Sequence, residues 1–152
     1  MLLYPLYKAV KKQLEDVLGL QCFFFLKQYE PSKDNTSYKV PAIYIEMPNY
    51  RGVSIEYYGK REKFVSNLEI KVHYISYAPF KNHTSTIQDT ALQQHHNKLI
   101  DINNALEGFR PKTSSNVLLA EAFWTAETSE MNFMANCIVS VIGYKCKAYI
   151  RD

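Results

Sequence analysis

The sequence predicts an α+β protein, in which a mainly antiparallel sheet of about six strands carries an N-terminal helix and one long helix. Its predicted strands follow one another in hairpins instead of alternating with helices. Two segments place apolar residues at steps of three or four, as helices do, and the other apolar segments alternate at every second residue. With 152 residues, 47% hydrophobic and 22% charged, residues 1–152 fit a single domain with a sizeable core.

The first predicted helix covers residues 5–18. Pro5 suits a first helical turn, where its missing N–H has no partner to lose. Gly19 stands where a glycine commonly ends a helix. The apolar stripe of this helix is formed by Leu3, Leu6, Val10, Leu14 and Val17.

Four strands are predicted next, at residues 21–29, 40–47, 53–58 and 63–77. A polar loop at 30–39 follows the first of them. The last two form a hairpin, because Gly-Lys-Arg-Glu at 59–62 supplies turn residues.

A long helix is predicted at residues 85–107, with Gly108 as its C-terminal signal. Its buried stripe consists of Ile87, Ala91, His95, Leu99, Ile102 and Leu106. We expect Leu99, Ile102 and Leu106 to pack on Leu68, Ile70 and Val72. A loop at 111–116 then leads to strands at 117–126 and 132–150, which form a second hairpin through a Thr-Ser-Glu turn.

Charge and cysteine usage narrow the class of protein. The net charge of +3 is too mild to indicate nucleic-acid binding by itself. Three cysteines (Cys22, Cys137 and Cys146) without a CxxC pair indicate neither a disulfide framework nor a cysteine metal site, and favour a reducing compartment. The N-terminal segment lacks the pattern of a signal peptide, and the longest apolar run, at 22–26, is too short to cross a bilayer. We therefore expect an intracellular protein with no membrane partner.

The strand at 63–77 raises the question of catalysis. Glu69 and Lys71 point the same way from it, as in metal-dependent nucleases, where a carboxylate holds Mg²⁺ and a lysine polarises a phosphate. Glu46 or Glu56 could supply the second acid. A Glu-x-Lys pair is also common on any exposed sheet face, and no Pro-Asp dipeptide precedes the strand. We favour a solvated or subunit-facing surface formed by Glu69, Lys71 and His73, with no catalytic residues.

The remaining candidate sites are weaker. His95 and His96 diverge by about 100° on a helix and cannot clasp one metal from one face, so we expect a core His95 and a solvent-facing His96. His73 and His83 have no ligand at metal-binding spacing. No glycine-rich phosphate loop or G-x-S-x-G is present, and we predict no cofactor and no metal. Basic and aromatic side chains mix at 57–64, which is either a solvated hairpin tip or a contact surface for a partner. The candidate contact residues there are Tyr57, Tyr58, Lys60, Arg61 and Lys63.

In its layout the chain resembles the phage tail terminator, or tail completion, proteins over nearly its whole length. The features that carry the resemblance are the opening helix, "VPAIYIEM" at 40–47, "LEIKVHYIS" at 68–76, "HHNKLIDINNALEGF" at 95–109 and "ANCIVSVIGYKCKAYI" at 135–150.

This resemblance implies a structural role without catalysis. Such proteins assemble as a ring, typically of six subunits, on the last ring of a finished tail tube, and present a surface to the head–tail connector protein. The resemblance therefore implies a virion protein, assembled in the host cytoplasm, whose partners are its own copies, the tail tube protein and the connector, with DNA only passing through the channel. Twelve tyrosines suit polar, wet interfaces of this kind. Other neck or head–tail joining proteins, a Mg²⁺-dependent nuclease, and a small-molecule or peptide-binding module with an aromatic-rich sheet stay open as alternatives.

Overall fold

The computed structural model describes residues 3–28, 38–48, 54–59, 62–78, 85–128, 131–134 and 136–150. Within these residues the chain forms two helices and a mixed, mostly antiparallel sheet of seven strands, which confirms the predicted α+β class. The elements follow in the order α1 (Tyr4–Leu18), β1 (Cys22–Phe24), β2 (Ala42–Glu46), β3 (Glu56–Tyr58), β4 (Glu62–Tyr77), α2 (Ser85–Leu106), β5 (Trp124–Thr128), β6 (Asn132–Met134) and β7 (Cys137–Ile150).

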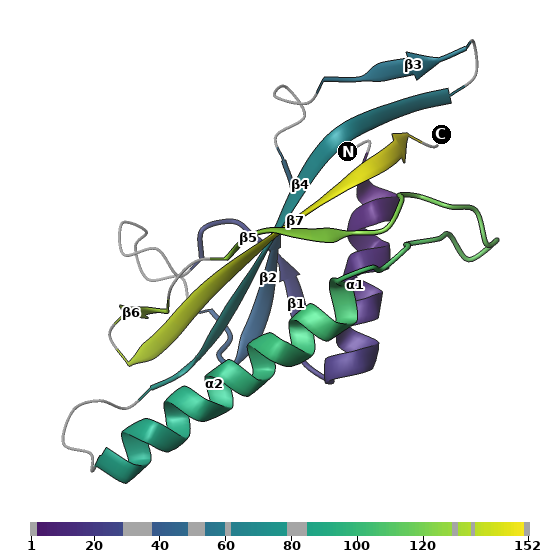
Figure 1. Ribbon diagram of the computed structural model, residues 1–152. Helices are drawn as coiled ribbons and strands as arrows, with labels where there is room; N and C mark the ends of the chain where they lie inside the picture. The colour runs from purple at the N-terminus through teal and green to yellow at the C-terminus, as the bar shows by residue number, and fades with distance from the viewer. Residues whose placement is uncertain are drawn as a thin grey trace.

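The sheet is built around two long strands, β4 and β7, which pair antiparallel from Lys63–Ile150 to Tyr77–Cys137 (Figure 1). The strand order is β1-β2-β4-β7-β5, with β3 paired to β4 and β6 paired to β7. Only the β1–β2 pair among these described strands is parallel. Both outer sides of the sheet are therefore made of short strands.

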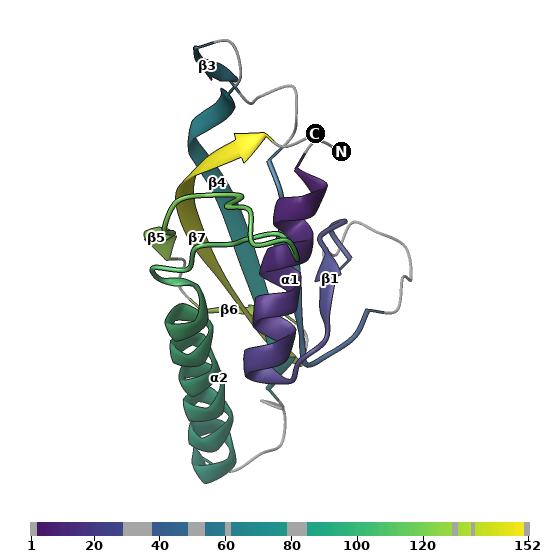
Figure 2. The same ribbon diagram turned by 90° about the vertical axis from the view of Figure 1, so that its right-hand side faces the viewer.

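Both helices cover the same face of the sheet (Figure 2). Side chains at alternate positions of β2, β4 and β7 join α1 and α2 in one core, because every second residue of a strand points to the same face. Its fully buried members include Ile45, Ile70, Leu106 and Tyr144. Neither helix of the described chain is long and apolar enough to span a bilayer.

Helix α1 matches its prediction within one residue. The backbone N–H of Gly19, whose φ is +66°, donates to the carbonyl of Glu15 at 2.9 Å and ends the helix. Most of the predicted stripe is buried, but Val17 is 56% exposed and that part of the prediction is wrong. In the last turn it is Leu18, the next residue, that packs against this core, so Val17 points away from it.

Helix α2 also has the predicted extent but a shorter buried stripe. Ile102 and Leu106 are fully buried, and Leu99 is partly buried against the same core as Leu68, Ile70 and Val72. Ile87 is 44% exposed, contrary to the prediction. The core side chains of α2 lie in its C-terminal half, and its first turns run along the side of the sheet beyond that core (Figure 1).

Three predicted strands differ clearly from those observed. The strand predicted at 21–29 is limited to β1, Cys22–Phe24, and residues 25–28 are not part of a strand. The strand predicted at 117–126 is instead a connection with isolated bridges at Leu118 and Ala120, and β5 begins only at Trp124. The strand predicted at 132–150 turns back on itself, so that β6 pairs with the start of β7 from Asn132–Val139 to Met134–Cys137. The predicted loop at 30–39 lies mostly outside the described residues.

A second, smaller core lies on the face of the sheet opposite the helices, here called the second face. Its buried members are Ala42, Tyr44, Ile75, Cys137 and Val139, with Phe23, Phe25, Tyr38 and Val40 packed against them. This cluster covers only the end of the sheet where β4 finishes and β7 starts. The three cysteines are buried free thiols.

Candidate interaction surfaces

The hairpin of β3 and β4 lies at the end of the sheet farthest from α2 (Figures 1 and 2). Tyr57 pairs with Lys63 across the hairpin; the tyrosine is 68% exposed and the lysine is exposed as well. The predicted contact residues Lys60 and Arg61, and the side chain of Tyr58, lie outside the described part of the structure. The hairpin thus presents an aromatic ring and a cation to solvent.

The base of this hairpin is held by side-chain contacts. Ser66 Oγ donates a hydrogen bond to the carboxylate of Glu56, which joins the two strands. On β7, the Nζ of Lys147 lies 4.4 Å from the ring centroid of Phe64, within the range of a cation–π contact. Val65, next in β4, is buried. These contacts give the exposed tip a fixed base.

The predicted row of Glu69 and Lys71 lies on the second face, where the register adds charged neighbours from other strands. Glu46 pairs with Lys71, and Lys145 pairs with Glu69. Glu127 of β5 lies in the same row as Lys71, with Gly143 between them. Three carboxylates and two ammonium groups therefore alternate across the middle of this face, and their charges nearly cancel.

Gly143 has no side chain and therefore leaves a depression at the centre of this charged row. A Cβ atom at that position would lie 3.1 Å from Glu69 Oε1, so any larger side chain would require the carboxylate to shift. A hollow of about 230 Å³ lies here, lined by Glu46, Lys71, His73, Glu127, Val141 and Gly143. Its charged lining and small size suit contact with a polar surface better than burial of an apolar ligand.

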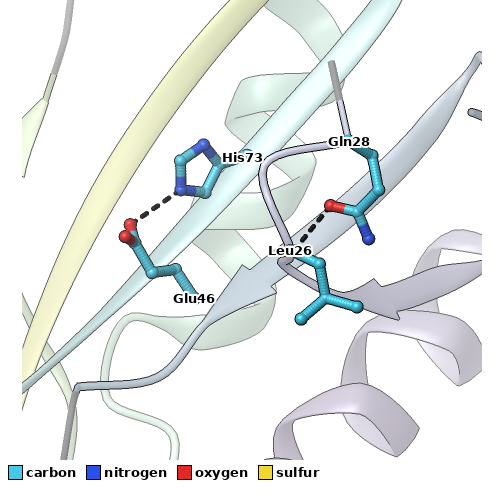
Figure 3. A network of polar contacts seen from close by, with 4 residues as sticks. All are labelled: Leu26, Gln28, Glu46 and His73. Carbon is cyan, nitrogen blue, oxygen red and sulfur yellow. Dashed lines mark hydrogen bonds and ion pairs between the residues drawn. The ribbon is translucent and has the colours of Figure 1, made fainter. Parts of the chain in front are cut away.

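His73 does not face outward as predicted. The residue is only 6% exposed, because the ring of Phe25 stacks on its ring with centroids 4.0 Å apart and planes 14° apart. His73 Nε2 lies 2.9 Å from Glu46 Oε2, at hydrogen-bond distance (Figure 3). The expected solvent-facing row is therefore limited to Glu69 and Lys71, and His73 joins the second-face core to the charged row.

The structure places both acids considered for a metal-dependent nuclease near Glu69. Glu46 lines a hollow together with Glu69 and Lys71, whereas Glu56 lines a separate one with Glu69 and is bonded to Ser66. Within the described residues, no group of three or more His, Cys, Asp or Glu side chains is arranged to hold a metal ion.

His95 is a core residue, as predicted, and it joins α2 to the sheet. It is 1% exposed, with Nδ1 2.7 Å from Ser76 Oγ and Nε2 2.9 Å from Ser140 Oγ. Its ring stacks on Tyr74 with centroids 4.7 Å apart. A neutral ring satisfies both serines, because one nitrogen donates and the other accepts. Burial, with a smaller effect of the neighbouring His96, lowers the pKa of His95 to about 4.

The contact between α2 and the sheet is filled by side chains. Ile102 and Leu106 are fully buried there, and the Tyr144 hydroxyl donates to Asn103 Oδ1 at 3.1 Å. This packing argues against the alternative in which a ligand binds between the long helix and the sheet.

Sequence reasoning did not include Glu127, Gly143 and Lys145 in the charged surface. Lys145 alternates with the buried Tyr144 and Cys146, which was a usable signal for its face. Glu127 could not be placed, because a bulge between Thr125 and Glu127 shifts the β5 register.

In comparisons with known proteins, no family model matches this sequence and no curated protein matches it.

Proposed function

We propose that this chain is a ring-forming structural protein of the phage tail terminator type. In this role, copies of the chain, six in the typical ring, cap the finished tail tube and join it to the head–tail connector protein. It acts in the virion without catalysing a reaction, after assembly in the host cytoplasm.

The observation that carries the proposal is the pair of short, different outer strands on opposite sides of the sheet. On one side β3 pairs only with β4, and on the other β5 pairs only with β7, within the described residues. Outer strands of this kind generally leave backbone groups that can pair with another chain, although the N–H of Thr125 on β5 already donates to Glu107 Oε2. A contact between two unlike surfaces of neighbouring copies is heterologous, and it closes into a ring when the rotation is right.

The side chains on these outer strands favour a wet, reversible contact. Tyr57 on β3 is 68% exposed and Trp124 on β5 is 42% exposed, and aromatic residues are enriched at protein interfaces. Lys63 lies beside Tyr57, with Glu56 and Glu62 in the same hairpin, and Glu127 lies on the same strand as Trp124, so both sides also carry charged side chains. A ring held by such contacts should weaken as salt screens them.

Charge reversal at the hairpin tests the proposal. We expect the isolated wild-type protein to be monomeric at micromolar concentration, or to form rings that dissociate as salt rises, in mass photometry. Arg61→Glu with Lys63→Glu should leave the circular dichroism spectrum unchanged and impair ring formation and tail joining, seen by electron microscopy. Lys27→Glu with Lys98→Glu makes the same net change outside the hairpin and is the matched control. A tight dimer insensitive to salt, together with mutant tails that complete normally, would contradict the proposal.

A second candidate, the Mg²⁺-dependent nuclease, is favoured by one observation: Glu46, Glu69 and Lys71 line one hollow. It predicts cleavage of plasmid or branched DNA in Mg²⁺ or Mn²⁺ that Lys71→Ala abolishes and Lys145→Ala, on the same face, does not. Absence of cleavage across metals and pH would remove this candidate.

A further inference from the structure

A groove of about 420 Å³ lies on the helix side of the molecule, between α1 and the connection from α2 to β5. We propose that this groove binds an acidic peptide segment of a partner protein, anchored by an apolar side chain. The inference is independent of the ring proposal, because the groove uses none of the residues of the β3–β4 hairpin or of the second face.

The floor of the groove is apolar and shaped by both walls. Pro5 and Ala9 contribute from α1, and Leu119, which is 3% exposed, contributes from the connection. The ring of Tyr4, 50% exposed, borders the same groove. A floor of this kind can remove an apolar side chain from water, which a phosphate or a bare carboxylate does not need.

The rim of the groove is basic. Lys8, Lys12 and Lys112 surround it and are exposed. Lys12 Nζ lies 2.6 Å from Asp16 Oδ2, one helical turn later, and this ion pair offsets the charge of Lys12. Lys8 and Lys112 still give the rim a net positive charge. No acidic residue is among the groove-lining side chains of the described chain. Charge complementarity therefore selects an acidic segment over a neutral or basic one.

The second wall is pre-formed. A short hairpin at 112–118 is closed by two backbone hydrogen bonds, Thr113 N–H to Val117 O at 2.8 Å and Asn116 N–H to Thr113 O at 2.9 Å. The N–H of Leu119 also donates to Pro111 O at 2.8 Å, which ties the hairpin to the segment after α2. The helix and the hairpin are both ordered before binding. The entropy cost of ordering on binding therefore falls on the partner segment and not on the groove.

Binding can be tested with a fluorescein-labelled peptide that has a central leucine–tryptophan pair flanked by glutamates. We expect saturable binding by fluorescence anisotropy that weakens with salt. Amide shifts in nuclear magnetic resonance should cluster on the first three turns of α1 and on residues 112–119. Replacing the glutamates by glutamine, or the leucine–tryptophan pair by serine, should each abolish or strongly weaken binding.

Protein variants separate the groove from general electrostatics. Lys8→Gln with Lys112→Gln should weaken binding about three- to tenfold. Lys71→Gln with Lys145→Gln removes the same charge from the second face and should leave binding unchanged. Equal loss in both pairs, shifts outside the groove, or tighter binding of a single-stranded oligonucleotide of thymidines would overturn the proposal. Ring formation by the Lys8→Gln, Lys112→Gln protein is expected to be normal, so this test and that of the ring can fail separately.

Discussion

Acidification should destabilise this protein through His95, the buried histidine that joins α2 to the sheet. Its pKa is lowered to about 4 in the folded protein, against an ordinary value of 6.5. Between these two values the unfolded chain binds a proton that the folded chain does not. The contribution of His95 to the free energy of unfolding is therefore fully present above about pH 6.5, and it is lost as the pH is lowered toward 4.

The size of the effect follows from the two pKa values and the geometry. The full difference corresponds to roughly 3 kcal/mol once the pH is below both values, and to about 2 kcal/mol between pH 7 and pH 5. The side chains against the ring are Ser76, Ser140 and Tyr74, none of which carries a negative charge that could stabilise the protonated form. A protonated ring would also donate from both nitrogens, so one serine would have to reorient.

Urea unfolding followed by circular dichroism at a series of pH values measures the effect. His95→Gln keeps a hydrogen-bonding side chain but cannot titrate, so its unfolding free energy should fall about 2 kcal/mol less than that of the wild type between pH 7 and pH 5. All other titrating groups are common to both proteins and cancel in this difference. Parallel loss of stability in the two proteins would refute the reasoning, since His95 would then not be held neutral by the fold.

Two further predictions concern burial. Leu106→Ala removes a fully buried side chain and should lower the unfolding free energy by about 2–5 kcal/mol. Leu99→Ala, at a partly buried position, should lower it by less. Equal losses in chemical denaturation would show that the buried stripe of α2 is misassigned. Burial raises the thiol pKa of Cys22 and of Cys146 to about 12, so neither should react with Ellman's reagent until the protein is unfolded in denaturant; prompt labelling of the native protein would contradict their packing.

Local sequence signals predicted the helices and the long strand β4 well. Pro5 and Gly19 mark the two ends of α1, and strict alternation from Leu68 to Tyr74 marks the face of β4 that meets the helices. The position of His95 on the stripe of α2 predicted its burial correctly, although the same stripe failed at Ile87. These features depend on neighbours within a few residues, which a sequence pattern records directly.

Features that depend on distant pairing could not be predicted in the same way. The turn between β6 and β7 has no glycine or proline at 135–136, so the apolar run from 132 to 150 reads as one strand. Alternation places His73 on the charged face, but its burial comes from Phe25, which reaches it through the pairing of β1 with β2. The basic groove likewise combines α1 with a segment more than a hundred residues later in the sequence.

The ladder between β4 and β7 also constrains how the protein is made. During synthesis β4 leaves the ribosome before the whole of α2, β5 and β6, and its partner β7 follows only after them. Throughout that interval the side of β4 that will receive β7 has unpaired backbone groups, next to apolar residues such as Ile70 and Val72. Because β7 lies between β4 and β5, a nascent chain that stops before β7 lacks a central strand of its sheet and not an edge strand. Slow translation or ribosome stalling within β5 or β6 should therefore favour aggregation more than stalling before β4 does.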